Sequence, residues 1–411
     1  MGDVAGVEED LRRILWIQAL RAALYGFGTV VLGSSLAAGG LSDTQVGFVF
    51  TAMLAGMALV SVSVGLIGDR VGRRRLYVGL LCLLGVAGAV FALTDALVVL
   101  VLVALTGTLS TDANESGPIT SLEQAMIGAA PGSARVHVFG RYNAVAFLAG
   151  ALGALAAGGP AFLQSLGPSW PSGQRWLLLF PLVAAVCVAI GLRLTPAVEG
   201  GVTVGARPLE RSRGTVSKLA ALFALDAFAG GFVVTTFVVF WFQRRFGAGP
   251  ELMSLVVFAG GLIQAGSSMA AARVGARFGL LNTMVFSHLP SNLLLIAVPL
   301  MPSLPWSIAV LLARFALSQM DVPTRQAYIA AMVDPEERTA AAAFTNTARY
   351  VARPFGPVLG GALMTGVALG APFVAAGALK VVYDLALWRV FRTVRLEQPA
   401  GAGGPASTQA T

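Results

Sequence analysis

The fold of this chain can be worked out from one short stretch, Gly65-Leu66-Ile67-Gly68-Asp69-Arg70-Val71-Gly72-Arg73-Arg74-Arg75. The stretch is basic and rich in glycine, and it joins two apolar segments, residues 43–68 and 75–94. Each segment is close to the ~20 residues that a helix needs to cross the hydrocarbon core of a bilayer. The pattern predicts two membrane-spanning helices connected by a tight, charged loop at the membrane surface.

The rest of the sequence repeats this apolar pattern from end to end. Hydrophobic residues make up 56% of the 411 residues and charged residues 12%, a balance that excludes a water-soluble globular protein. Because lipid offers no hydrogen-bonding partner, each apolar segment must satisfy its backbone within a helix. We predict an all-α polytopic membrane protein with about twelve spans, at residues 14–36, 43–68, 75–94, 97–127, 136–159, 175–194, 217–242, 251–272, 280–300, 306–333, 339–365 and 371–391.

The basic residues are distributed unevenly between alternate loops. The formal net charge of +8 could indicate binding to nucleic acid, but topology explains it better. With the N-terminus inside, only Arg175, Arg244 and Arg245 fall on the outer face. This asymmetry follows the positive-inside rule and predicts both termini in the cytoplasm. We expect a multi-pass protein of the cell membrane, and the arginine- and alanine-rich composition favours a bacterial inner membrane.

A polar stretch divides the spans into two equal sets, and the two sets match each other. Setting Arg135 on Arg338 also sets Asn143 on Asn346, Gly153 on Gly356 and Gly158 on Gly361 without a gap. Parallel repeats of this kind place a substrate site between the halves, near the bilayer midplane. We divide the chain into a cytoplasmic N-terminal segment (1–13), an N-terminal six-helix bundle (14–194), a cytoplasmic linker (195–216), a C-terminal six-helix bundle (217–391) and a disordered cytoplasmic tail (392–411).

The loop of residues 65–75 resembles the loop signature of the major facilitator superfamily of secondary transporters. The residues at positions of that signature are Gly65, Asp69, Arg70, Gly72, Arg73 and Arg74. A degenerate copy lies between the eighth and ninth predicted spans. The resemblance implies two six-helix bundles that rock about a central site. It also implies that this loop holds the bundles together on the cytoplasmic side when the transporter faces outward.

A cytoplasmic gate follows from the same resemblance. Asp69 and Arg73 would contact the start of the eleventh span. Glu123 and Arg325, at repeat-related positions near the cytoplasmic ends of the fourth and tenth spans, are interpreted as further parts of this gate. The alternative is that Arg70 and Arg73 only anchor the topology of the chain.

Charged residues inside the predicted spans are the candidates for the transport site, because a charge at the bilayer centre costs about 2.5–3.5 kcal/mol on insertion scales. We assign the substrate and proton cavity to Arg21, Asp112, Glu115, Arg141, Asp226 and Asp321. Asp112 and Glu115 share one face of a continuous helix, so their repulsion would favour retention of a proton by one of them. With Arg21 or Arg141 as the competing partner, this predicts proton coupling. The alternative is a static network of ion pairs.

Three further ionisable residues are interpreted as structural. Lys380 and Asp384 are four residues apart in the twelfth span and are expected to pair with each other. His288, in the ninth span, has no acidic residue nearby in the sequence and is expected to pack between helices rather than relay protons.

The sequence contains no enzyme motif. It has neither a phosphate-binding loop for ATP nor a His/Cys cluster for a metal, so we expect no cofactor and no enzymatic activity. We predict a monomeric, proton-linked secondary transporter that moves a small organic solute by alternating access, with export favoured. The excess of arginine within the spans favours an anionic solute. Proton-driven uptake of a small organic anion, a non-transporting receptor and a lipid flippase are the alternatives on the same fold.

Overall fold

The computed structural model describes residues 2–110, 112, 117–127, 132–166, 170–171, 173–199, 209–333 and 337–393. In these ranges the chain forms helices and no strand. The first half contains α1 (Gly2–Ala38), α2 (Asp43–Val71), α3 (Arg73–Leu93), α4 (Leu97–Ala104), α5 (Pro118–Ile127), α6 (Gly132–Ala156), α7 (Gly159–Leu166), η1 (Gly173–Leu178), α8 (Leu179–Gly191) and η2 (Pro196–Glu199). The second half contains α9 (Arg213–Gly231), α10 (Thr235–Phe246), α11 (Pro250–Phe278), α12 (Leu280–Ala297), η3 (Val298–Leu300), α13 (Leu304–Ser318), α14 (Asp321–Met332), α15 (Arg338–Ala352), α16 (Phe355–Gly366) and α17 (Ala371–Phe391).

The all-α membrane fold predicted from the sequence is confirmed. By length and composition, 9 helical stretches of the described residues could cross a bilayer. The other three predicted spans, residues 97–127, 306–333 and 339–365, are each broken near the middle into two shorter helices. The span predicted at 217–242 is also broken, between α9 and α10. Spans that are interrupted near the bilayer midplane are typical of transporters. The backbone groups that lose their helical partners at the break border the substrate site.

Glycine and proline explain two of these breaks. Gly107 has a left-handed backbone with φ 66°, and a methyl group added there would lie 2.4 Å from backbone atoms of Gly56. Only glycine fits both conditions. Pro118 is the first residue of α5, a position whose backbone N–H would have no partner within the helix, so proline is tolerated there. Pro354 separates α15 from α16 in the same way. Residues 105–110 and 112 are therefore not helical, although the sequence predicted a continuous span there.

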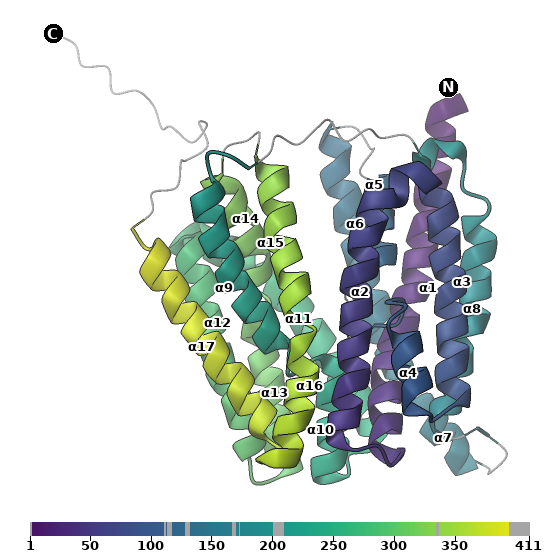
Figure 1. Ribbon diagram of the computed structural model, residues 1–411, viewed down its shortest axis with the longest axis vertical. Coiled ribbons are helices and arrows are strands. Elements are labelled where there is room, and N and C mark those ends of the chain that lie inside the picture. The colour runs from purple at the N-terminus through teal and green to yellow at the C-terminus, as the bar shows by residue number, and fades with distance from the viewer. Residues whose placement is uncertain are drawn as a thin grey trace.

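The helices form two groups (Figure 1). We call α1–α8 the N-group and α9–α17 the C-group. The groups meet where α2 packs on α16, α1 on α10 and α6 on α11. In Figure 1, α2 and α15 diverge toward the end that holds the start of α1 and the end of α17, which we call the terminal end. The opposite end, with α7, α10 and α16, is the far end, and here the two groups lie together.

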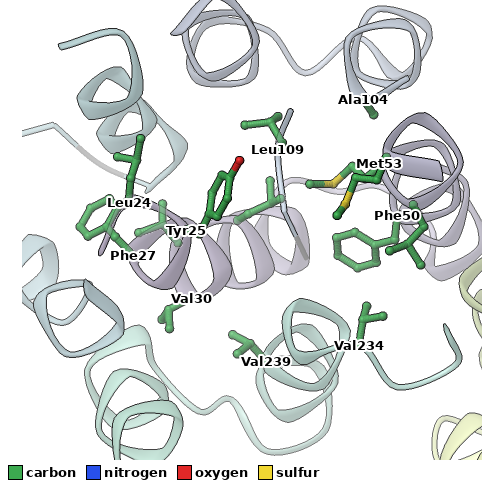
Figure 2. Packing of buried hydrophobic residues seen from close by; sticks show 14 of the residues in the cluster. Leu24, Tyr25, Phe27, Val30, Phe50, Met53, Ala104, Leu109, Val234 and Val239 are labelled. Carbon is green, nitrogen blue, oxygen red and sulfur yellow. The ribbon is translucent and has the colours of Figure 1, made fainter. Parts of the chain in front are cut away.

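One apolar cluster crosses the boundary between the groups. Val30 of α1 and Phe50 of α2 lie close to Val234 and Val239 of the C-group (Figure 2). The rings of Phe50 and Phe237 are 5.8 Å apart in an edge-to-face arrangement. In lipid such contacts are stabilised by close packing rather than by exclusion of water. The far end is thus closed by a packed interface.

The repeat-related glycines occupy equivalent places in the two groups. A methyl group on Gly153 would lie 1.8 Å from a backbone oxygen of α1, and one on Gly356 would lie 2.4 Å from a backbone carbon of α9. Both therefore bring helices of one group together. A methyl group on Gly158 would lie 2.6 Å from a side-chain oxygen of α11, and one on Gly361 would lie 2.3 Å from a backbone oxygen of α2. This second pair brings the two groups together, in agreement with the predicted repeat.

Candidate functional site

Asp112 joins the two groups of helices. Its carboxylate accepts a hydrogen bond from the guanidinium of Arg353 at 2.6 Å and another from the backbone N–H of Thr235 at 2.8 Å. Arg353 lies at the break between α15 and α16, and Thr235 is the first residue of α10. A carboxylate at a helix N-terminus is favoured by the helix dipole as well as by the N–H group. Three of the broken spans therefore meet at one carboxylate.

The partner of Asp112 differs from the one expected. The sequence suggested Arg21 or Arg141, whereas the structure gives Arg353, 241 residues away. Arg141 is exposed on α6 and has no hydrogen bond or ion pair in the described part of the chain. Because Asp112 lies in the non-helical segment, the helical face that it was expected to share with Glu115 does not extend to it. Glu115 itself lies outside the described residues.

Arg21 pairs with Glu123 inside the N-group. The two side chains are 2% and 0% exposed, and their charged atoms are 2.5 Å apart. Tyr77 donates its hydroxyl to the same carboxylate at 2.7 Å, and Tyr142 donates to it as well. Thr120 of α5 also bonds to Arg21, at 3.1 Å. A buried ion pair with this many hydrogen bonds has its charges satisfied within one group of helices.

A second buried network lies inside the C-group. Asp226 of α9 lies 2.5 Å from the ammonium of Lys380 and 3.7 Å from the guanidinium of Arg325. Asp321, one turn before Arg325 on α14, pairs with the same guanidinium at 2.9 Å. Asp226 and Asp321 were expected to meet Arg21 and Asp112 in one cavity. The structure instead assigns them to cations of their own group.

His288 has two acidic neighbours that the sequence did not indicate. Its Nδ1 lies 2.9 Å from Asp384, and its Nε2 lies 4.0 Å from Asp226. Asn292 donates a hydrogen bond to Asp384 at 2.8 Å. Lys380 and Asp384 therefore do not form the expected pair. Lys380 pairs with Asp226 of α9, and Asp384 contacts His288 of α12. Helical spacing alone could not show this, because the stronger partners come from neighbouring helices.

The site residues predicted from the sequence thus fall into three clusters. These are the Arg21–Glu123 pair in the N-group, the network of Asp226, Asp321 and Arg325 in the C-group, and Asp112 between the groups. In the part of the chain that the structure describes, no three His, Cys, Asp or Glu side chains gather as metal ligands.

The fold and these clusters can be compared with known proteins. The family model for the Major Facilitator Superfamily matches residues 15–320 and 219–410. The chain belongs to the Major Facilitator Superfamily. A relative in Saccharomyces cerevisiae, the uncharacterized membrane protein YJR124C, is 27% identical over 418 residues, which cover 92% of this chain and 93% of that protein.

Solved structures of transporters share the fold. The nucleoside transporter NupG superposes with a TM-score of 0.74 at 14% identity, over 93% of this chain and 99% of that chain. A bacterial homolog of the human lysosomal transporter Spinster, in an inward-facing and occupied conformation, superposes with a TM-score of 0.72 at 17% identity, over 93% and 96% of the two chains. This member of the superfamily is therefore a multi-pass membrane protein with the fold of a transporter.

The signature loop of this superfamily member is held by its own group in the present conformation. The Glu199 carboxylate accepts the backbone N–H groups of Arg73 at 2.6 Å and Arg74 at 3.2 Å, at the start of α3. Gly72 turns the chain there with φ 97°. The side chain of Arg73 is buried and donates to a carbonyl of α5 at 3.4 Å.

The other predicted gate residues do not connect the two groups in the described part of the chain, or lie outside it. Gly65 and Arg70 are exposed on α2, and the side chain of Asp69 lies outside the described set. Glu123 and Arg325 belong to separate networks in the two groups. A gate at the terminal end stays a prediction for a conformation in which that end is closed.

Proposed function

We propose that this protein is a proton-linked secondary transporter that moves a small organic solute by alternating access, with export favoured. Membership of the superfamily supports transport across a membrane. The observation that supports proton linkage is the Asp112 carboxylate, which contacts Arg353 and the N-terminus of α10 across the boundary between the groups. A titratable group in that position makes the contact between the groups sensitive to protonation.

The proposed cycle uses the charge of Asp112. The ionised carboxylate attracts the guanidinium of Arg353 and the positive end of α10, and so stabilises the closed far end. A proton on Asp112 removes the negative charge and weakens both contacts, so that the far end can part. Under the predicted topology the far end faces the outside, so its packed interface would correspond to an inward-facing conformation. The signature loop with Asp69 and Arg73, together with Glu123 and Arg325, would close the opposite end in the second half of the cycle.

The test is proton movement driven by solutes. Purified protein is reconstituted into vesicles that contain a pH-sensitive dye, and a panel of organic anions, organic cations, sugars and nucleosides is applied with and without an imposed pH gradient. In the wild type we expect transport of one class of solute to be accompanied by proton movement. In Asp112→Asn that solute should be transported without protons or not be transported. Asp43→Asn is a matched control, because Asp43 also contacts an arginine across the far end: its carboxylate lies 3.4 Å from Arg244, whose side chain is 47% exposed.

The outcomes separate the parts of the proposal. Solute transport that stays coupled to the pH gradient in Asp112→Asn would exclude Asp112 as the proton carrier. The sign of the gradient that drives accumulation distinguishes export from proton-driven uptake. Absence of transport for every class would favour a receptor or a lipid flippase on the same fold.

A further inference from the structure

Arg349 of α15 is a cation in the middle of a predicted span. Among the described residues it has no hydrogen-bond or ion-pair partner, and its Nε is inaccessible to solvent. The residue as a whole is partly exposed. The other arginines that border it are neutralised, Arg325 by Asp321 at 2.9 Å and Arg353 by Asp112 at 2.6 Å.

The position of Arg349 directs it toward the boundary between the groups. Arg353 follows it by four residues, and the N–H of Arg353 donates to the Arg349 carbonyl at 3.0 Å, so the two side chains lie on one face of the helix. Arg353 contacts Asp112 of the N-group from that face. Asn346, three residues before Arg349, lies on the same face, is exposed and has no partner in the described part of the chain.

None of the charges around Arg349 forms an ion pair with it in the described part of the chain. The like charge of Arg325 acts on it most strongly, the carboxylates of Asp226 and Asp321 attract it from a greater distance, and Arg353 repels it more weakly. Unpaired cations at membrane depth are costly, and those that persist mark sites for ions or substrates.

We propose that Arg349 binds the carboxylate or phosphate group of the transported solute, with Asn346 beside it as a polar contact. This inference rests on the proposed transport function and names the class of solute as an organic anion. Guanidinium groups suit this role because they offer paired donors in the plane of a carboxylate or phosphate. Arg353 and Asp112 lie next to the site, so a bound anion would also affect the contact that holds the far end closed.

The test combines ligand-free stability with the response to matched probes. Thermal unfolding of the purified protein is measured alone and with benzoate against benzamide, and with glucose 6-phosphate against glucose. The variants are Arg349→Gln and the conservative Arg349→Lys. Arg245→Gln is the control because Arg245 is exposed at the end of α10 and forms no ion pair with any residue that the structure describes. We expect at least one anion, but not its neutral counterpart, to raise the melting temperature of the wild type and of Arg245→Gln.

In Arg349→Gln the anion concentration needed for half of that stabilisation should rise by about tenfold or more, since a hydrogen bond to a charged group is lost. Arg349→Lys should restore part of the response. Without ligand, Arg349→Gln should melt at or above the wild-type temperature, because no partner loses its charge. A structural arginine would give the opposite result, a lower melting temperature with an unchanged response to anions.

Two results would overturn the assignment without affecting the transport proposal. One is stabilisation by neutral probes only, which would leave a transporter of uncharged solutes. The other is an anion response that is the same in Arg349→Gln and in Arg245→Gln. Failure of the transport proposal is read separately, from proton and solute movement in the Asp112 variants.

Discussion

The contact between Asp112 and Arg353 predicts how easily the far end opens. Asp112→Asn keeps an acceptor for the N–H of Thr235 but loses the charge that attracts Arg353. The side chains of Asp112 and Arg353 are 21% and 28% exposed, so this ion pair is intermediate between a surface pair and a buried pair. We therefore expect a loss of about 1.5 kcal/mol from the closed state, which is roughly a tenfold larger open population.

The open population can be measured from the labelling rate of a buried cysteine. Val239 of α10 is 0% exposed and packs at the interface with α1, so a cysteine there reacts with a small maleimide only when the far end opens. The background lacks Cys82 and Cys187, the two natural cysteines. Labelling of Val239→Cys should be about tenfold faster when Asp112→Asn is added.

Two controls make the reasoning refutable. Ala87 is also 0% exposed but packs within the N-group, so labelling of Ala87→Cys should not change with Asp112→Asn. Arg244→Gln removes a longer ion pair at the far end, 3.4 Å from Asp43 and with the Arg244 side chain 47% exposed, and should accelerate labelling of Val239→Cys by only about twofold. If Asp112→Asn changed the two cysteine probes equally, or changed neither, the contact would not be what holds the far end closed.

Three other outcomes follow from the structure. Gly153→Ala should destabilise the protein by about 1–3 kcal/mol in thermal unfolding, because its methyl would meet a backbone oxygen of α1 at 1.8 Å, whereas Gly79→Ala, which has open space, should not. Glu337 accepts three backbone N–H groups at the start of α9, which lowers its pKa from 4.5 to about 2, so its contribution to stability is complete above pH 4.5 and is lost as the pH falls toward 2. Glu337→Gln should remove that pH dependence from acid-unfolding curves. His288→Leu should cost about 3 kcal/mol in unfolding experiments because it leaves Asp384 buried beside one remaining donor, and Asp384→Asn in the same protein should recover part of the loss.

The sequence predicted the fold well because the signals are local. Apolar length locates a span, and charged loops and proline separate one span from the next. The breaks were harder to predict: Gly107 ends α4 because of its fit against Gly56, a contact between helices that the order of residues does not reveal. The repeat was visible in the sequence because Gly153 and Gly356 are both required by close helix contacts.

The site was predicted only in part, because partners cannot be read from spacing along one helix. Asp112 was identified as important from its cost in lipid, but Arg353 was not identified as its partner, since 241 residues separate them. Lys380 and Asp384 had the spacing of a helical pair, yet each has a closer partner on another helix. In a packed bundle a buried charge can find its partner on a neighbouring helix, as Lys380 does, or along its own helix, as Asp321 does with Arg325, and spacing in the sequence does not distinguish the two.

The distribution of the charges suggests which of them can take part in transport. The Arg21–Glu123 pair satisfies its charges inside the N-group, and Asp226 does so among cations of the C-group. If each group moves as a rigid body, these internal contacts are the same in every conformation and cannot report which end is open. Contacts across the boundary must change. Among the charges described here, that leaves the pair of Asp43 with Arg244, the pair of Asp112 with Arg353, and Arg349 beside the latter pair. At Asp112 and Arg349 a proton and an anion can each alter the balance between the two conformations.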